Sequence, residues 1–511
     1  MSLTKKIALN TALHTLGKFG ASFIGIFVVA ILTRYLGIEG YGRYTTIFAY
    51  LFFFAILSDL GLYVVTVNEL GRSKYGEEKF FNNIFTMRFI TALILMIIAS
   101  ALVWIFPYSL IIKLGVIVAS FSIFLNLLDQ LIVAFFQNKI NMKRVAIAEL
   151  IGKLVLLGIT VFFVYLKLNL IWLIIAIILG FLVNFLINLN YLKKFIKLKF
   201  EFDKEIWKNI LKISWPIAIT SIFSLIYFKA DTLFLSILPV NPAYALSNEA
   251  AVGIYGAPYK ILEVLIAFPA IFMGLVSPLL AKAWVLQCHP ERSEAKSKDP
   301  EKNTSITGSF PLTFFQKVRG QDKFNLIFQK TFDTLSIIIW PLIIGVLVLA
   351  KPLIVLVAGS QFAVSAPVFQ ILIWAAAIIF ITHLTTYSII AIGKQKKMIK
   401  FYLVAATLAV AGYIFLIPRY SYFAAAWTTV GIEFFMLIST IFILKKYSCI
   451  KINLKIFGKA MLASVIMGFI LNWLRDFNVV LLVVLGGMIY FGILVLIKGV
   501  DRRFIVAGSV L

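Results

Sequence analysis

Charged side chains stand inside long apolar runs of this 511-residue sequence. A charge at mid-membrane costs about 2.5 to 3.5 kcal/mol on insertion scales, so such residues usually face a cavity or a partner. The cations could bind an anionic group, and they are Lys18, Arg34, Arg88, Lys229 and Lys260. The embedded carboxylates are Asp59, Asp129, Glu149, Asp231, Glu263 and Glu433. Four of them, all except Asp129 and Glu149, are candidates for ion coupling or charge balance.

Two pairs of opposite charges have helical spacing. Glu149 and Lys153 are four residues apart, which places them on one helical face, and we interpret them as a structural pair. Lys260 and Glu263 are three residues apart and could neutralise each other. Glu263 also continues a polar stripe from Tyr255, so a cavity role there is equally favoured.

Polar side chains form stripes along two of the apolar runs. Their spacing places each set on one helical face. We interpret both faces as lining a gap between two halves of the protein, although Ser22, Gly25 and Ser221 alone would also suit close helix packing. The two stripes are Thr11, His14, Lys18, Ser22 and Gly25, and Ser214, Ser221, Ser224 and Asp231.

The common catalytic and nucleotide-binding motifs are absent from the sequence. With three histidines, one of them in a charged loop, we expect no histidine-rich metal centre. The sequence contains no G-x-x-x-x-G-K-[ST] loop for ATP, no G-x-S-x-G elbow and no H-E-x-x-H segment. We therefore expect neither enzyme activity nor a cofactor.

The composition is that of an integral membrane protein. Hydrophobic residues make up 62% and charged residues 14% of the chain, against about 45 to 50% and about 25% in soluble proteins. A helix needs about 20 mostly apolar residues to cross a bilayer, and such runs recur without the alternation of a membrane barrel. The pattern predicts an all-α polytopic protein with about 14 transmembrane helices. The predicted spans are 8–35, 44–67, 83–106, 110–136, 145–166, 170–190, 211–238, 251–284, 331–357, 364–392, 399–417, 422–444, 457–474 and 478–498.

The distribution of basic residues predicts the orientation. Short cytoplasmic loops carry an excess of Lys and Arg. With the N-terminus inside, 36 of the 48 basic residues fall on the cytoplasmic side of these spans. We therefore expect both termini in the cytoplasm, and we assign the net charge of +26 to orientation and to anionic membrane lipids rather than to nucleic acid. Cys288 and Cys449 map to this reducing side, so no disulfide is expected.

Two short motifs recur at related spacings. Gly42 and Gly253 open the second and eighth predicted spans at an offset of 211 residues, and Lys193 and Lys445 close the sixth and twelfth at an offset of 252. The difference of 41 residues equals the length of the polar stretch 285–325, which lies between the two matches. Removing this stretch brings two six-span halves into register.

The repeat predicts four parts of the chain. Parallel repeats imply a pseudo-two-fold axis along the membrane normal and a binding site between the halves, although such short matches can also arise by chance. The parts are a six-helix lobe at 1–195, a cytoplasmic basic linker at 196–212, a second six-helix lobe at 213–446 with the polar cytoplasmic insertion 285–325, and two extra C-terminal helices at 447–511.

These motifs resemble those of a known family. The stretches similar to it are Thr33-Arg34-Tyr35-Leu36-Gly37, Glu39-Gly40-Tyr41-Gly42, Ser58-Asp59-Leu60-Gly61-Leu62, Trp215-Pro216, Ala230-Asp231, Gly253-Ile254-Tyr255 and Lys351-Pro352-Leu353-Ile354. They resemble bacterial polysaccharide-export proteins, the flippases of lipid-linked oligosaccharides, within the multidrug/oligosaccharidyl-lipid/polysaccharide exporter superfamily. The resemblance implies a V-shaped transporter in the bacterial inner membrane and a substrate in which pyrophosphate joins a glycan to a polyprenyl lipid.

The resemblance implies a specific role for the embedded cations. Lys18, Arg34, Arg88, Lys229 and Lys260 would face the pyrophosphate while the sugar occupies a hydrated cavity and the lipid tail stays in the bilayer. The flippase would serve O-antigen, capsule or exopolysaccharide synthesis, with a proton or sodium ion as a possible counter-ion. The alternatives are a multidrug/cation antiporter of the same superfamily, which should favour buried carboxylates over lysines, and a membrane glycan polymerase.

Overall fold

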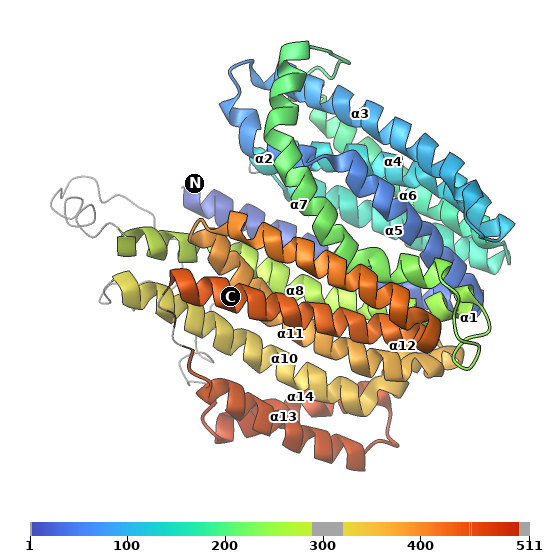
Figure 1. Cartoon of the computed structure of the whole chain (residues 1–511), viewed down its shortest axis with the longest axis vertical. Coiled ribbons are helices and arrows are strands. Elements are labelled where there is room, and N and C mark those ends of the chain that lie inside the picture. Colours follow the sequence, from blue (N-terminus) through green and yellow to red (C-terminus); the bar gives the residue numbers. More distant parts are fainter. Residues whose placement is uncertain (1–2, 140, 289–319, 449, 451, 500–511) are drawn as a thin grey trace. The chain divides into compact units, whose positions relative to one another are not determined.

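The computed structural model describes residues 3–139, 141–288, 320–448, 450 and 452–499, and these residues form helices and connecting loops without a β-strand (Figure 1). Its contacts divide the chain into two compact units, Met1–Gly256 with Ala406–Ala425, and Ala257–Ala405 with Ala426–Leu511. The helices that begin in the first unit are α1 (Leu3–Asp59), α2 (Leu62–Glu69), α3 (Glu77–Leu102), α4 (Leu110–Asn138), α5 (Lys143–Tyr165), α6 (Leu170–Leu192), α7 (Lys204–Ile237) and α8 (Asn248–Cys288). Those that begin in the second are α10 (Gly320–Ala358), α11 (Ala366–Ala391), α12 (Ile399–Tyr447), α13 (Lys455–Trp473) and α14 (Val479–Leu496).

The helices account for the predicted spans. Within the described ranges, 11 helices are long and apolar enough to cross a membrane. Two of them, α1 and α12, each combine two predicted spans, and α7 coincides with the predicted span 211–238 although it is not among the 11. The all-α, multi-pass prediction is therefore confirmed, while the lobe boundaries at 195 and 213 stay a prediction.

Both combined helices break at a single residue of unusual backbone conformation. In α1 the break is at Gly37, whose φ is 72°, a value that only glycine adopts without strain. In α12 it is at Ser421, whose φ of 49° places a serine in the left-handed region. Each break falls between two predicted spans, so each marks a place where the chain changes direction.

Helical structure extends into both ends of the predicted polar insertion. Helix α8 extends to Cys288 and α10 begins at Gly320, so both ends of the predicted insertion 285–325 continue flanking helices. Residues 289–319 lie outside the described residues, as does Cys449.

Apolar side chains cover the outside of the helices as well as their contacts. Phe23, Ile105 and Phe469 are 62%, 78% and 74% exposed, as expected for side chains that face lipid. Within the first unit, Phe81, Phe135 and other aromatic residues form a buried cluster between α2, α3 and α4. Apolar side chains therefore both face the lipid and form the contacts between the helices.

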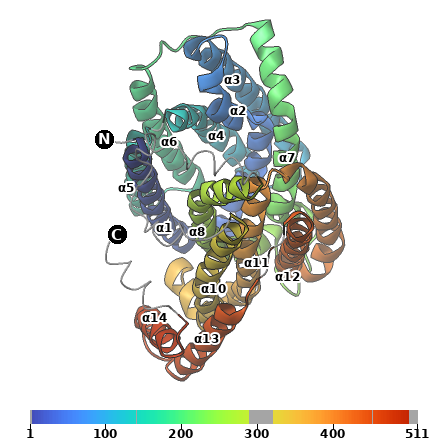
Figure 2. The ribbon, with the colours of Figure 1, turned by 90° about the vertical axis from the view of Figure 1, so that its left-hand side faces the viewer.

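The second unit contains the two C-terminal helices. Helices α13 and α14 lie side by side and pack against α10 (Figure 2). Their shared core includes Leu349, Met467 and Leu482, and the Tyr490 hydroxyl donates to the Ile337 carbonyl over 2.7 Å. The two C-terminal helices are therefore attached through α10, while their status as an addition to a six-helix lobe stays a prediction.

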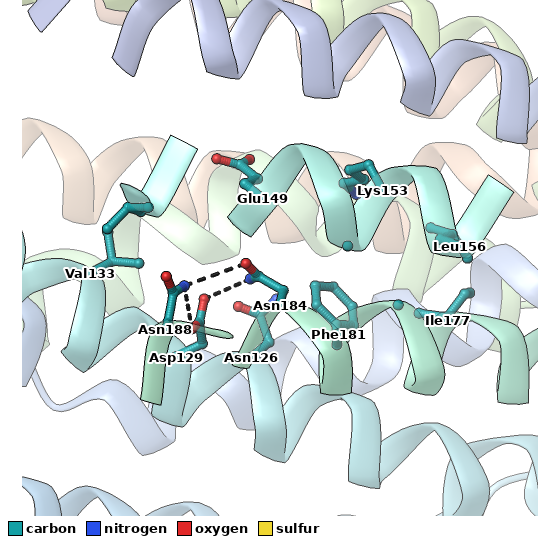
Figure 3. A pocket seen from close by; sticks show the side chains of 13 residues that line it. Asn126, Asp129, Val133, Glu149, Lys153, Leu156, Ile177, Phe181, Asn184 and Asn188 are labelled. Atoms are coloured by element: carbon teal, nitrogen blue, oxygen red, sulfur yellow. Dashed lines mark hydrogen bonds between the residues drawn. The ribbon is translucent and has the colours of Figure 1, made fainter. Parts of the chain in front are cut away.

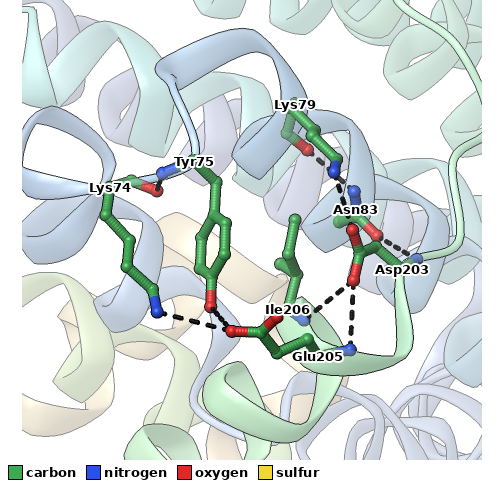
Figure 4. A network of polar contacts seen from close by, with 8 residues as sticks. Lys74, Tyr75, Lys79, Asn83, Asp203, Glu205 and Ile206 are labelled. Atoms are coloured by element: carbon green, nitrogen blue, oxygen red, sulfur yellow. Dashed lines mark hydrogen bonds and ion pairs between the residues drawn. The ribbon is translucent and has the colours of Figure 1, made fainter.

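The segment between α6 and α7 is bound to the start of α3 (Figure 4). The Lys79 ammonium lies 2.7 Å from an Asp203 carboxylate oxygen, and the Tyr75 hydroxyl donates to Glu205 over 2.8 Å. The Lys79 hydrogen bond and the backbone N–H of Ile206 hold the pKa of Asp203 below its usual value. Tyr75 and Lys74 likewise lower the pKa of Glu205. This linker is thus fixed to the first unit by charge-assisted contacts.

Glycines let α1 and the start of α8 approach to backbone contact. A Cβ on Gly42 would lie 1.7 Å from the Glu249 carbonyl oxygen, and one on Gly253 would lie 2.1 Å from that of Ile38. These are the two glycines that the sequence repeat pairs with each other. Side chains larger than hydrogen are excluded from this contact.

Gly42→Ala and Gly253→Ala are each expected to destabilise the protein, because overpacking of this kind costs about 1–3 kcal/mol. The measurement is the thermal unfolding midpoint of the purified chain, which should fall by several degrees. Gly25→Ala is the control on α1, since a Cβ there meets no atom within 4 Å. Unchanged midpoints for both test variants would contradict this packing.

Candidate functional site

A pocket of about 300 Å³ lies inside the first unit between α4, α5 and α6 (Figure 3). Its apolar lining includes aliphatic side chains from all three helices, Val133 from α4, Leu156 from α5 and Ile177 from α6. Its polar lining consists of Asn126 and Asp129 from α4, Glu149 and Lys153 from α5, and Asn184 and Asn188 from α6. Apolar helices of this length do not need such side chains for packing, which makes the pocket a candidate binding site.

Asp129 is bound by two amide groups at one end of the pocket. Asn184 Nδ2 donates to one carboxylate oxygen and Asn188 Nδ2 to the other, both over 2.8 Å. Asp129 is 7% exposed, and the two amides satisfy a charge that would otherwise be costly to bury. Asn188 Oδ1 is buried and has no hydrogen-bond partner among the described residues. Figure 3 shows the three side chains converging.

The lining of the pocket also includes an aromatic ring and two opposite charges. Lys153 Nζ lies 5.8 Å from the centre of the Phe181 ring. Glu149 and Lys153 stand one helical turn apart on α5, and both are half-buried and engaged in further interactions. The helices approach closely here because Gly152 and Gly180 face each other: a Cβ on Gly152 would lie 2.8 Å from the Gly180 carbonyl oxygen.

A buried arginine connects α1 and α3 to the pocket. Arg88 is 0% exposed, and its Nη1 lies 2.7 Å from Asp59 Oδ1. Arg88 Nε donates to the Leu127 carbonyl over 3.1 Å, and Nη2 donates to Gln130 Oε1 over 3.1 Å. Gln130 Nε2 in turn donates to Asn126 Oδ1 over 3.2 Å, and Asn126 lines the pocket. Arg88 therefore positions the pocket-lining residue Asn126 through Gln130, without lining the pocket itself.

Both carboxylate oxygens of Asp59 accept hydrogen bonds. Its Oδ2 accepts from the backbone N–H of Gly61 over 3.2 Å. Leu60 and Gly61 both have positive φ, 47° and 75°, so the carboxylate stabilises the turn that ends α1. Asp59 thus ties this turn to Arg88.

The remaining cations of the predicted anion site each have their own surroundings. In the first unit, Arg34 is exposed, and Lys229 is half-buried with its Nζ 5.8 Å from the centre of the Phe52 ring. In the second unit, the Lys260 Nζ lies 2.6 Å from Glu263 Oε2, with the lysine side chain 53% exposed. The side chain of Lys18 lies outside the described residues, as do Thr11, His14, Ser221 and Ser224. Their assembly into one anion site stays a prediction.

Two of the predicted carboxylates are completely buried. Asp231 accepts from the Tyr255 hydroxyl over 2.5 Å and from the Thr232 backbone N–H over 2.6 Å, so residues of two family-like motifs bind each other. Glu433 on α12 is 2% exposed, and its Oε2 has no hydrogen-bond partner among the described residues. Asp231 is therefore satisfied by the protein, whereas Glu433 is not.

The structure adds residues to which the sequence analysis gave no role. Asn126, Asn184 and Asn188 were not singled out, and Asp129 was named only as an embedded carboxylate. The sequence feature that could have indicated this site is the spacing of Asn184 and Asn188, two amides four residues apart in an apolar run. In the described part of the chain, no group of three or more His, Cys, Asp and Glu side chains could hold a metal ion.

Arg88→Ala is expected to lower the free energy of unfolding by about 3–5 kcal/mol, because it leaves a carboxylate without its buried partner. The measurement is chemical unfolding of the purified protein in detergent. The double variant with Asp59→Ala should lose less than the sum of the single losses, since the two groups interact. The control is exposed Arg475→Ala, with a change within about 0.5 kcal/mol. Full stability of Arg88→Ala with loss of function would instead place Arg88 on the substrate.

Comparisons with known proteins agree with this architecture. In the solved structure of the lipid II flippase MurJ in an inward closed conformation, 98% of that chain aligns with 94% of this one at a TM-score of 0.69 and 15% identity. An inward-facing multidrug resistance MATE family transporter of the MOP superfamily aligns over 92% of this chain and 99% of its own, with a TM-score of 0.59 and 13% identity. A MOP superfamily transporter from Pyrococcus furiosus, described as having a binding pocket of reverse polarity, aligns over 87% of this chain and 96% of its own, with a TM-score of 0.55 and 12% identity. These likenesses establish the fold.

Sequence comparison identifies the family. No curated protein matches the chain. The family model for polysaccharide biosynthesis proteins matches residues 7–284, which is more than half of the 511 residues. The chain therefore belongs to the polysaccharide biosynthesis protein family.

Proposed function

We propose that this protein moves a lipid-linked oligosaccharide from the inner to the outer leaflet of the bacterial inner membrane by alternating access, with both of its termini in the cytoplasm. Membership of the polysaccharide biosynthesis family is the observation that carries the proposal. The fold shared with a lipid II flippase and the polar pocket of about 300 Å³ inside an apolar bundle support it. The products served would be O-antigen, capsule or exopolysaccharide.

In this proposal the pyrophosphate is recognised by cations other than Arg88. The guanidinium of Arg88 is enclosed and bonded to Asp59, so a positioning role suits it better than ligand contact. Lys18, Arg34, Lys229 and Lys260 stay candidates. A membrane potential that is negative inside favours outward movement of an anion, by about 2.3 kcal/mol per charge and 100 mV.

A cation antiporter is the second candidate, and one observation favours it. The described charged side chains that are fully buried are Arg88, Asp129, Asp231 and Glu433, three acids and one base. Buried carboxylates suit a cationic substrate. Asp129 and Asp231, however, are already bound by protein donors, so this observation counts for less than the family match.

Deletion of the gene is expected to abolish the surface glycan and to cause lipid-linked repeat units to accumulate on the inner leaflet, because glycan assembly would continue without translocation. The measurement is enzymatic labelling of those units in intact and permeabilised spheroplasts, with labelling only after permeabilisation. Lys229→Ala and Lys260→Ala should restore export less than the exposed control Lys396→Ala does.

Two other results would replace the proposal. Unchanged surface glycan with lost resistance to cationic drugs would establish the antiporter. Short, unpolymerised units on the outer surface would indicate a glycan polymerase.

Glu433 is the best-supported coupling group among the predicted carboxylates. Asp59 is paired with Arg88, Glu263 with Lys260, and Asp231 with Tyr255. No described residue donates a hydrogen bond to the buried Glu433 Oε2. The titratable side chain of Tyr402 interacts electrostatically with Glu433. A buried carboxylate oxygen that no described residue bonds to can be satisfied by a proton or a cation from outside. We place ion coupling there.

Glu433→Gln is expected to reduce export at least tenfold and to leave thermal stability unchanged or raised, because a neutral amide is less costly to bury than a charge. The measurements are transport in proteoliposomes under separately imposed proton and sodium gradients, and the thermal midpoint. Exposed Glu78→Gln is the control. Normal gradient-driven transport by Glu433→Gln would exclude this role, and a large loss of stability would make it structural.

A further inference from the structure

We propose that the pocket between α4, α5 and α6 binds one neutral sugar ring of the glycan and disfavours sugar acids. The inference rests on the proposed function, since it takes a glycan to be the substrate. It goes further by assigning a sugar subsite and its selectivity to named residues. Four features of the pocket carry it: size, charge, hydrogen-bonding capacity and an aromatic wall.

The size of the pocket suits a single ring. Its volume of about 300 Å³ is at the lower end of the range for small-molecule sites, about 300–1,000 Å³. A complete lipid-linked oligosaccharide would not fit. The close approach of Gly152 and Gly180 limits the width, because α5 and α6 are already in backbone contact there. The pocket therefore accepts one sugar of a longer substrate.

The charges in the pocket disfavour another anion. Asp129 and Glu149 supply two carboxylates against the one ammonium of Lys153. The amides of Asn184 and Asn188 already bind both oxygens of Asp129, and no cation among the described side chains forms an ion pair with it. A sugar acid would add a like charge where water is scarce, which is costly. A neutral ring avoids this cost.

The polar groups are those that a sugar hydroxyl can use. Hydroxyl groups both donate and accept hydrogen bonds. Among the described side chains and backbone groups, none donates to Asn188 Oδ1, and a sugar hydroxyl that reaches this oxygen would supply a donor. Asn126 presents an amide held in place by Gln130, and Glu149 adds a further acceptor to the lining. Oxygen-rich lining with several acceptors thus matches a polyhydroxy ligand.

Phe181 supplies the apolar contact that a sugar ring also needs. The ring lies on α6 one helical turn from Asn184, next to the Asp129 cluster (Figure 3). The carbon-bound hydrogens of a pyranose face can pack on such a ring while the hydroxyls bond at its edge. Aromatic walls with a few placed polar groups are the usual design of small-molecule sites.

A metal ion or an organic cation fits this arrangement less well. The carboxylate oxygens of Asp129 each accept an N–H, so the groups that face Asp129 are donors rather than the oxygen ligands of a hard cation. A quaternary cation has no hydrogen to give to Asn188 Oδ1. Both nevertheless serve as competing probes.

The test is sugar binding to the purified full-length protein in lipid nanodiscs, free of maltoside detergent because that headgroup would compete. The probes are N-acetyl-D-glucosamine, D-glucuronate, sodium chloride and tetraphenylphosphonium, and binding is followed by saturation-transfer NMR. We expect saturable binding of N-acetyl-D-glucosamine and at least tenfold weaker binding of D-glucuronate. Asn184→Ala and Phe181→Leu should weaken sugar binding at least tenfold, and Glu149→Gln should reduce the discrimination against glucuronate.

The matched controls lie on the same helix. Asn190→Ala changes an exposed asparagine outside the pocket, and Phe185→Leu changes a phenylalanine in the neighbouring apolar core. Both should bind N-acetyl-D-glucosamine as the unchanged protein does. Thermal midpoints of all variants separate lost binding from lost folding.

The outcomes separate this inference from the proposed function. Glucuronate binding as tight as that of N-acetyl-D-glucosamine, or sugar binding that survives both pocket substitutions, would overturn the inference while leaving flippase activity intact. Displacement of the sugar by tetraphenylphosphonium or sodium at low concentration would assign the pocket to a cation and also overturn it. Sugar binding that fails only in the pocket variants would uphold it, even if the deletion strain accumulated no lipid-linked units.

Discussion

The ion pair between Arg88 and Asp59 is the interaction on which the first unit depends. It brings a charge into an apolar bundle where an unpaired guanidinium would be very costly. The cost is offset because every part of the pair has a partner: α4 supplies a carbonyl and an amide, and the backbone of Gly61 supplies a donor. The pair therefore fixes α1, α3 and α4 in one relative arrangement, and through Gln130 it holds Asn126 at the wall of the pocket.

Of the four buried charged side chains in the described part of the chain, Arg88, Asp129 and Asp231 have protein partners, whereas Glu433 has a carboxylate oxygen that lacks one. Arg88 is paired with Asp59, the Asp129 carboxylate accepts from two asparagines, and Asp231 accepts from Tyr255, so in each case the protein supplies the partner of the charged group. Such pairings give a bundle specific contacts that apolar packing alone would not define. Glu433 has a buried oxygen without a donor in the described part of the chain, and a missing partner of this kind points to a ligand or proton from outside. The proposed coupling role of Glu433 rests on this difference.

Some motif residues acquire their meaning only from their partners. The sequence pairs Gly42 with Gly253 as repeated positions, and in the structure these glycines lie in one contact where only hydrogen fits. Asp231 and Tyr255 come from two further short stretches and bind each other. The sequence predicts Arg88 as a contact for an anionic substrate, and it does not reveal that Asp59, 29 residues earlier, forms an ion pair with it. Pairings between helices depend on side-chain direction and on how the helices pack, which spacing within one helix does not contain.

The sequence by itself determined that this is a helical membrane protein and where nearly all of its helices lie. A bilayer forces each crossing segment to satisfy its own backbone hydrogen bonds over about 20 apolar residues, so hydrophobicity along the chain is sufficient to locate them. The tertiary structure decided which polar side chains are closed off and which line a pocket. Asn126, Asp129, Asn184 and Asn188 are separate polar residues in the sequence and become one site only where α4, α5 and α6 meet. Whether they meet depends on distances between helices, and those distances are set by packing of side chains that are far apart in the chain.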